Sequence, residues 1–154
     1  MMWQRTYQLG VVVEDLDRAR QFYESAGVGP FLEGPSRAAR NRKVHGRPAP
    51  DVVVRGLIAQ MGPVELELLQ PVAGDSIQRE ALDAIGEHAL HLCAYTDDLR
   101  RDVAEMAARG FPVISEGEFD DGGSFAYFDT REVGGLILEL YQLGDEAGVA
   151  TVVD

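Results

Sequence analysis

The sequence predicts an α+β fold in which two βαβββ modules form one curved, eight-stranded sheet shaped like a cup. The first observation is an internal duplication, since residues 8–16 repeat the pattern of residues 91–99 at an offset of 83. The second is that Leu-Glu-Leu-Leu-Gln at 66–70 returns as Leu-Glu-Leu-Tyr-Gln at 138–142, at an offset of 72. A unit of this size cannot bury its sheet face alone, so two copies are expected to pair edge to edge, with their helices on the convex side.

The bulk composition predicts a single domain over residues 1–154 with an ordinary hydrophobic fraction of 45%. The formal net charge of −12 argues against nucleic acid and anionic membrane surfaces as partners. Cys93 has no second cysteine with which to form an intrachain disulfide. The sequence contains no signal-peptide pattern and no run of transmembrane length, so we expect a cytoplasmic protein.

The first module, about residues 5–70, shows alternating and helical apolar patterns in turn. Apolar residues at helical spacing predict a helix over 16–25, which Gly27 ends. Alternation and turn residues predict strands at 6–13, 31–32, 51–61 and 64–69, the last two joined by a turn at 62–63.

The segment 33–50 interrupts the first module and accounts for the roughly eleven residues by which that module is longer. It is rich in Gly, Pro and Ala, which predicts a long surface loop or a hairpin extension. It also holds five of the fourteen basic residues: Arg37, Arg40, Arg42, Lys43 and Arg47. One interpretation is a solvated loop that offsets the acidic surface. The other is a binding surface for a phosphate or carboxylate of a substrate, since Arg binds both groups well.

The second module, about residues 88–143, follows a linker at 71–87 that has one helical stretch at 77–85. Its first strand carries His91, and Asp97 and Asp98 then supply an N-cap for the next helix. The remaining patterns predict a helix at 99–109 and strands at 113–115, 124–129 and 136–142, followed by a loose tail at 144–154.

Duplication places equivalent polar side chains at equivalent points of the cup. Gln8 and His91 lie on the two first strands, and Glu67 and Glu139 lie on the two last strands. Each is on the strand face opposite the aliphatic residues, so all four are expected to point into the cup. A buried carboxylate must find a cation or take up a proton. Two carboxylates, an imidazole and an amide oxygen therefore predict a site for a divalent metal ion.

The segments at 11–23, 66–71 and 91–95 resemble the vicinal oxygen chelate superfamily over roughly residues 6–143. This superfamily includes glyoxalase I, methylmalonyl-CoA epimerase, extradiol dioxygenases and fosfomycin or bleomycin resistance proteins. The resemblance implies a glyoxalase-like fold and puts the four metal positions on Gln8, Glu67, His91 and Glu139. A ligand set that begins with Gln8 looks like that of zinc-type glyoxalase I rather than the two-His-one-carboxylate set of a dioxygenase.

One departure concerns the epimerase branch, which uses a second acidic base on the strand at 51–61. Arg55 stands where that carboxylate is expected, which argues against a two-base racemisation. We instead take Arg55 as a candidate substrate contact, together with Arg42, Arg47, Tyr95 and Tyr141.

The leading functional hypothesis is a metal-dependent isomerase, lyase or epimerase of a small carbonyl compound. The cofactor would be zinc, nickel, cobalt or manganese, and Glu139 would take a proton from the carbon next to the carbonyl. The alternatives are a metal-free protein that sequesters a ligand or antibiotic, and an extradiol-type dioxygenase, which Gln8 disfavours. The expected partners are a small-molecule substrate, anionic in one interpretation, and a second copy of the chain, since such sheets leave an exposed edge.

Overall fold

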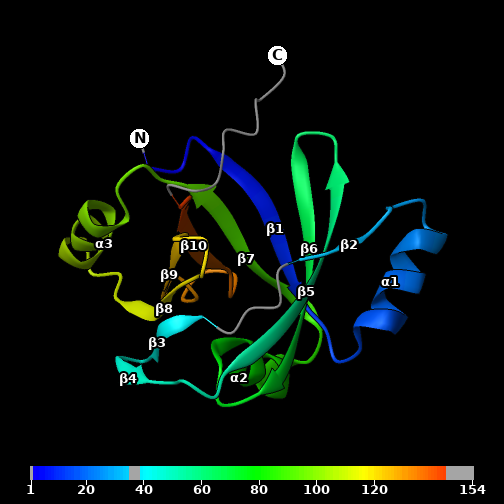
Figure 1. The fold of residues 1–154 in the computed structure, drawn as a ribbon, viewed down its shortest axis with the longest axis horizontal. Helices are drawn as coiled ribbons and strands as arrows, with labels where there is room; N and C mark the ends of the chain where they lie inside the picture. Colours follow the sequence, from blue (N-terminus) through cyan, green and yellow to red (C-terminus); the bar gives the residue numbers. More distant parts are fainter. Residues whose placement is uncertain (1, 35–38, 145–154) are drawn as a thin grey trace.

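The computed structural model describes residues 2–34 and 39–144, and in these residues the strands form a single mixed sheet (Figure 1). The strands are β1 Thr6–Val12, β2 Leu32–Glu33, β3 Arg40–Val44, β4 Arg47–Pro48, β5 Val53–Met61, β6 Val64–Ala73, β7 His88–Tyr95, β8 Val113–Glu118, β9 Ser124–Phe128 and β10 Ile137–Gln142. The helices are α1 Leu16–Ser25, α2 Ile77–Ile85 and α3 Leu99–Ala108. The strand order is β2-β5-β6-β1-β7-β10-β9-β8-β3-β4.

The sheet confirms the duplicated architecture. At its centre β1 runs antiparallel to β7, while β1 pairs in parallel with β6 and β7 pairs in parallel with β10. One module therefore supplies β2, β5, β6 and β1, and the other supplies β7, β10, β9 and β8 in the corresponding order. These eight strands are the predicted ones. The described sheet has ten strands, because β3 and β4 extend the second module at its outer edge.

Of the two forms predicted for residues 33–50, a surface loop or a hairpin extension, the second half of the segment takes the hairpin form. There β3 and β4 form a hairpin, and β3 pairs antiparallel with β8 of the other module. Opposite charges meet across this pair, since Lys43 Nζ lies 3.1 Å from Glu116 Oε1. Asn41 Nδ2 also donates to Glu118 at 3.3 Å. Cross-strand pairs of this kind stabilise a sheet, so part of the basic segment serves to dock the hairpin. Arg37 lies outside the described residues.

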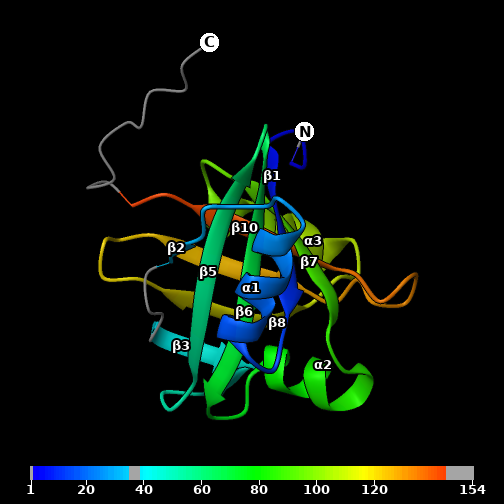
Figure 2. The ribbon, with the colours of Figure 1, turned by 90° about the vertical axis from the view of Figure 1, so that its right-hand side faces the viewer.

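Helices α1 and α3 occupy equivalent places on the outer face of the two modules. Each begins at an aspartate whose side chain accepts from a backbone N–H of the first turn, Asp15 from Arg18 and Asp98 from Arg101, both at 2.9 Å. Figure 2 shows α1 lying across the strands of the first module. Both helices pack on aliphatic strand residues, α1 on Leu57, Leu66 and Leu68, and α3 on Ala94, Ala126, Phe128 and Leu140.

Helix α2 closes one end of the cup. Its Ile77 and Leu82 join a cluster of buried side chains from both modules and from the hairpin: Val12, Val44, Val52, Val54, Leu69, Leu90, Ile114, Phe125, Tyr127 and Ile137. The space above this cluster, between the two halves of the sheet, is where the polar side chains gather.

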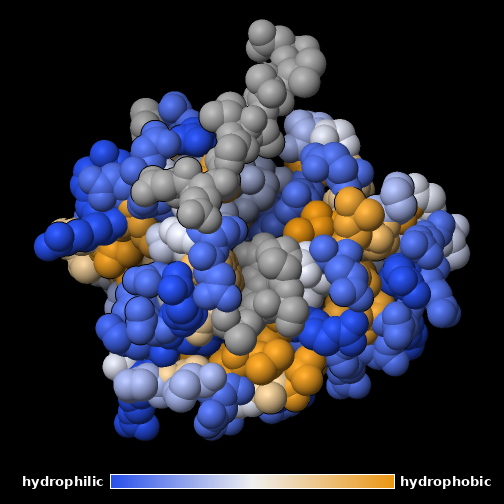
Figure 3. Space-filling view, viewed as in Figure 1, coloured by the Kyte–Doolittle hydropathy of each residue, from blue (hydrophilic) through white to orange (hydrophobic). Residues whose placement is uncertain are grey.

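The surface seen in Figure 3 is mostly hydrophilic, in keeping with the net charge of −12. Hydrophobic residues show on the side where Figure 1 places α1. Phe22 on α1 and Met61 on β5 are exposed apolar side chains that line one surface groove. No helix in the described ranges is long and apolar enough to cross a membrane. The predicted tail lies outside the described residues apart from Gly144, and the homodimer stays a prediction.

The close packing of β7 on β1 depends on a glycine. In the register of this pair Gly10 lies opposite His91, and Gln8 lies opposite Cys93. A Cβ atom added at Gly10 would lie 2.0 Å from Cε1 of His91 and 2.3 Å from its Nδ1. The imidazole therefore occupies the space that any side chain at position 10 would need.

This packing predicts that Gly10→Ala lowers the free energy of unfolding by about 1–3 kcal/mol, the usual cost of overpacking a buried position. Chemical denaturation of the single variants and of the double variant with His91→Ala would measure it. With the ring removed, the alanine should cost much less. An equal cost in both backgrounds would show that contact with His91 is not the cause.

Candidate metal centre and its cavity

The structure brings the four predicted metal ligands together at the bottom of the cup. Nε2 of His91 lies 3.1 Å from Oε2 of Glu139 and 3.5 Å from Oε2 of Glu67. It also lies 3.3 Å from Oε1 of Gln8. His91 is fully buried, and each of the other three is only 6% exposed. Residues that are far apart in the sequence thus place one nitrogen and three oxygen donors around one point.

Strand register explains why these four side chains meet. In the first module Gly10 pairs with Glu67 across β1 and β6, and in the second module Cys93 pairs with Glu139 across β7 and β10. Because side chains alternate along a strand, the leucines next to each glutamate point outward to α1 or α3. The glutamates are thereby turned inward at equivalent positions of the two modules.

A further glutamate orients the amide of Gln8. Nε2 of Gln8 donates to Oε1 of Glu65 at 2.5 Å, so its Oε1 is the atom that faces His91. An amide turned the other way would point its N–H groups at the ring and would offer no oxygen. Glu65 therefore holds the carbonyl oxygen of Gln8 toward the cluster.

The electrostatics of the site favour a cation. Burial lowers the pKa of His91 to about 3, so the imidazole is neutral and keeps a lone pair for coordination. The charged residues that line the cavity are Arg42, Glu65, Glu67 and Glu139. Fully ionised, they give the cavity a net charge of −2, which a divalent ion would balance.

The donor set fits a divalent metal ion in chemistry and in spacing. Atoms bound about 2.0–2.2 Å from one zinc ion lie roughly 3.0–3.5 Å from one another, the range found between Nε2 of His91 and its oxygen neighbours. In the structure these donors contact one another. Within the described residues no group of three or more His, Cys, Asp and Glu side chains is already arranged to hold an ion. Rotation of these side chains would turn the same donor atoms toward a shared centre.

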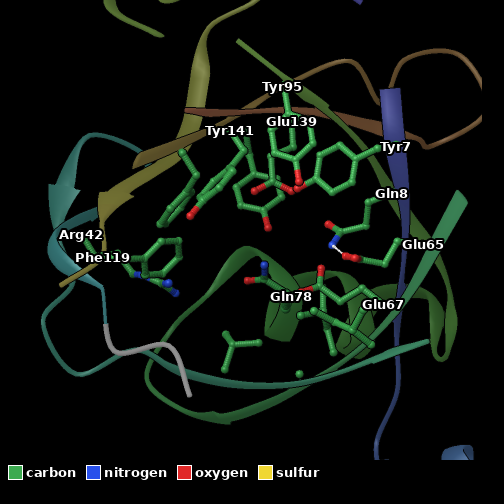
Figure 4. A pocket seen from close by; sticks show the side chains of 16 residues that line it. Tyr7, Gln8, Arg42, Glu65, Glu67, Gln78, Tyr95, Phe119, Glu139 and Tyr141 are labelled. Carbon is green, nitrogen blue, oxygen red and sulfur yellow. Dashed lines mark hydrogen bonds between the residues drawn. The ribbon is translucent and has the colours of Figure 1, made fainter. Parts of the chain in front are cut away.

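The cluster opens into a cavity of about 190 Å³ whose wall combines aromatic side chains with polar and charged ones (Figure 4). Tyr7 stacks on Tyr95 with ring centroids 3.9 Å apart, and Phe119 stacks on Phe125 at 5.2 Å. The lining residues are Tyr7, Gln8, Arg42, Val54, Gly56, Ile58, Glu65, Glu67, Leu69, Gln78, Tyr95, Phe119, Phe125, Tyr127, Glu139 and Tyr141. The wall offers apolar contact to a small molecule beside the polar cluster.

Burial also sets the protonation of other groups near the cluster. It raises the pKa of Tyr7, Tyr127 and Cys93 well above the usual range, and the charge of Glu139 adds to the effect at each. The phenols therefore stay protonated and offer O–H donors to the cavity. Cys93 stays a thiol, which makes it a poor nucleophile.

Three of the five predicted substrate contacts line the cavity and two do not. Arg42, Tyr95 and Tyr141 lie in its wall. Arg55 lies on β5 between lining residues and, by alternation, points to the opposite face, where it pairs with Glu33 at 3.6 Å. Arg47 lies on β4 in a separate surface groove. The structure thus places Arg47 and Arg55 outside this cavity, because a basic composition does not tell which side chains face inward.

Several lining residues were not predicted as part of the site. The clearest is Gln78 on α2, which is 4% exposed and reaches the cavity. A signal was present, since Gln78 lies four residues before the buried Leu82 and so shares its face of the helix. The aromatic residues Phe125 and Tyr127 share one face of β9, but nothing in the sequence indicated that this face meets the cluster.

Comparisons with known proteins agree with this fold. A search of the curated proteins finds no significant match. Among solved structures, methylmalonyl-CoA epimerase from Mycobacterium tuberculosis is 17% identical with a TM-score of 0.64, covering 90% of this chain and 87% of that one. Methylmalonyl-CoA epimerase in complex with methylmalonyl-CoA and NH4+ is 22% identical with a TM-score of 0.66, covering 92% and 95%. A Streptomyces coelicolor methylmalonyl-CoA epimerase variant in complex with 2-nitronate-propionyl-CoA is 22% identical with a TM-score of 0.67, covering 96% and 97%.

At these identities the structures establish a shared fold and no shared activity. The family is established by sequence. The model of the family described as "Glyoxalase/Bleomycin resistance protein/Dioxygenase superfamily" matches residues 7–128, which is most of the chain. The matched region runs from the start of β1 to the end of β9 and includes three of the four clustered residues, Gln8, Glu67 and His91. The chain belongs to this superfamily.

Proposed function

We propose that the protein is a metal-dependent isomerase, lyase or epimerase that removes a proton next to the carbonyl group of a small molecule. The observation that carries this proposal is the convergence of Gln8, Glu67, His91 and Glu139 on one point at the bottom of the cavity. The shared fold with methylmalonyl-CoA epimerases supports the epimerase branch of the proposal.

These four residues would hold the divalent ion. When bound, such an ion stabilises the negative charge that develops on the substrate oxygens as the proton leaves. The neutral ring of His91 would contribute its Nε2 lone pair, and Glu65 would keep the amide oxygen of Gln8 turned inward. Burial of the cluster excludes water and strengthens each of these electrostatic interactions.

Glu139 is the proposed base. Its carboxylate lies at the bottom of the cavity beside His91 and lines the space open to a substrate. Glu67 occupies the equivalent position in the other module, so a carboxylate faces the cavity from each half. Glu139 is the nearer of the two to Nε2 of His91, and we assign the proton transfer to it alone, since Arg55 stands where a second base is expected.

The second candidate is a metal-free binding protein of the same superfamily. A cavity with stacked aromatic side chains in its wall supports it, since such a cavity can bind a ligand without any chemistry. An extradiol-type dioxygenase is the least favoured candidate, because iron(II) oxygenases use two His ligands and this chain has Gln8 at one of those positions.

Metal content separates the enzyme from the metal-free binding protein. After refolding with zinc, nickel, cobalt or manganese and dialysis, we expect about one divalent ion per chain by elemental analysis. His91→Ala removes the nitrogen donor and should reduce the retained metal to background. His45→Ala is the matched control, because that exposed histidine lies outside the cavity. Wild-type protein that retains none of the four metals would favour the binding protein.

Loss of the base should abolish proton exchange while the fold survives. Glu139→Gln is nearly isosteric and keeps an oxygen donor, and removal of a general base typically lowers a rate about 10²–10⁴-fold. Exchange of substrate protons with deuterated solvent, followed by NMR on 2-oxoaldehyde adducts and 2-substituted acyl thioesters, would measure the loss. Glu24→Gln, a change of the same kind on the exposed face of α1, should have no effect. Undiminished exchange in metal-loaded Glu139→Gln would place the base at another residue.

A further inference from the structure

We propose that the part of the cavity formed by Arg42 and Gln78 binds a carboxylate group of the substrate. The substrate would then be a small carbonyl compound with its reacting carbon at the cluster of Gln8, Glu67, His91 and Glu139 and its carboxylate at the other end. The position of the reacting end rests on the proposed function. The carboxylate site rests on separate observations and holds whether or not a metal is bound.

The first observation is the amide of Gln78. This side chain is 4% exposed and lines the cavity, and Figure 4 shows it pointing into the open space. Helix α2 holds it there, because Ser76 caps the helix and Ile77 and Leu82 pack into the core. The amide makes no side-chain hydrogen bond to another of the residues that the structure describes, and it is open to the cavity. Its N–H and C=O groups are therefore available to a ligand.

The second observation is the burial of Arg42. Its position follows from an irregularity in β3, where the register with β8 shifts between Arg40 and Lys43 and Asn41 has a φ of +50°. A bulge of this kind re-aims side chains. The guanidinium of Arg42 lies over the ring of Phe125, 5.2 Å from its centroid, and lines the cavity while the side chain is only 7% exposed.

The two ends of the cavity differ in charge. In the strand order β1 and β6 lie on one side of β7 and β10, and β3 lies beyond β9 and β8 on the other. Figure 4 accordingly shows Arg42 across the cavity from Gln8 and Glu65. Glu65, Glu67 and Glu139 repel an anion from their side, whereas Arg42 attracts it. A ligand with one negatively charged end would therefore bind with that end toward Arg42.

The chemistry favours a carboxylate over a phosphate. One guanidinium balances one carboxylate, and the planar N–H groups of an arginine and an amide suit its two oxygens. A phosphate carries more charge than Arg42 balances, in a cavity with three glutamates. Between the two ends, the rings of Phe119, Phe125 and Tyr141 provide apolar contact for a short carbon chain.

The test uses butanoate, its uncharged isostere butanamide, and ethyl phosphate as probes, titrated into the full chain after treatment with a chelator. Without metal, no probe can bind through the ion. The binding result can therefore be interpreted even if the proposed metal site is wrong. Binding is followed by NMR through the side-chain amide signals of Gln78. Because a hydrogen bond to a charged group is strong, we expect butanoate to bind about 10- to 100-fold more tightly than butanamide or ethyl phosphate.

Single substitutions show which residues cause the preference for butanoate. Gln78→Leu should weaken butanoate binding about tenfold, and Arg42→Gln should remove the preference over butanamide. Both are followed through the ring signals of Phe125. If Arg42→Gln does not fold, Arg42→Lys replaces it. This variant keeps the positive charge but loses the planar pair of N–H groups, so it should bind butanoate less tightly than the wild type. Arg47→Gln is the matched control, since that arginine lies outside the cavity on the same segment, and it should leave the affinity unchanged.

Four outcomes would overturn the carboxylate site: no binding of butanoate, no preference over butanamide, tighter binding of ethyl phosphate, or a preference that survives Arg42→Gln and Gln78→Leu. The proposed function is judged separately, because Arg42→Gln removes a positive charge from the cavity and should retain at least as much metal as the wild type. A protein that retains metal and shows no preference for butanoate keeps the proposed function and loses the carboxylate site.

Discussion

The antiparallel pairing of β1 with β7 is the constraint on which the rest of the structure depends. It joins the two modules and sets Gly10 against His91, where the missing side chain of the glycine leaves room for the imidazole. The parallel partners β6 and β10 then bring Glu67 and Glu139 to the same point from either side. The centre of the cup therefore belongs to neither module by itself. Duplication supplies equivalent positions, and the pairing turns them into one site.

Burial gives this site its chemical character. A neutral imidazole, two inward carboxylates and a fixed amide oxygen lie where little water can screen them. Such a set is costly without a compensating cation, and it is strongly stabilised by one. The aromatic wall adds protonated phenols and apolar surface. The same enclosure that suits a metal ion therefore also limits the cavity to small ligands.

The hairpin β3–β4 makes the two modules unequal. It has no counterpart in the second half, and it crosses to the edge strand β8 of that half, where opposite charges hold it. By this crossing it carries Arg42 to the cavity from outside the duplicated framework. The repeated strands supply the acidic cluster, while the insertion and helix α2 supply Arg42 and Gln78. Residues that recognise the ligand can thus differ between proteins of this fold while the residues of the cluster stay the same. This agrees with a fold that hosts many chemistries.

The sequence by itself determined the duplicated strands, the three helices and the inward face of each core strand, because apolar alternation and helical spacing are local properties. This was enough to bring Gln8, Glu67, His91 and Glu139 together in prediction, since equivalent positions in a repeat must meet about the same axis. It did not determine where the insertion goes. Only the tertiary structure decided that Arg42 turns inward, that Arg47 and Arg55 turn away and that Gln78 reaches the cavity. These placements depend on pairing between strands far apart in the chain and on a bulge in β3, neither of which leaves a local pattern.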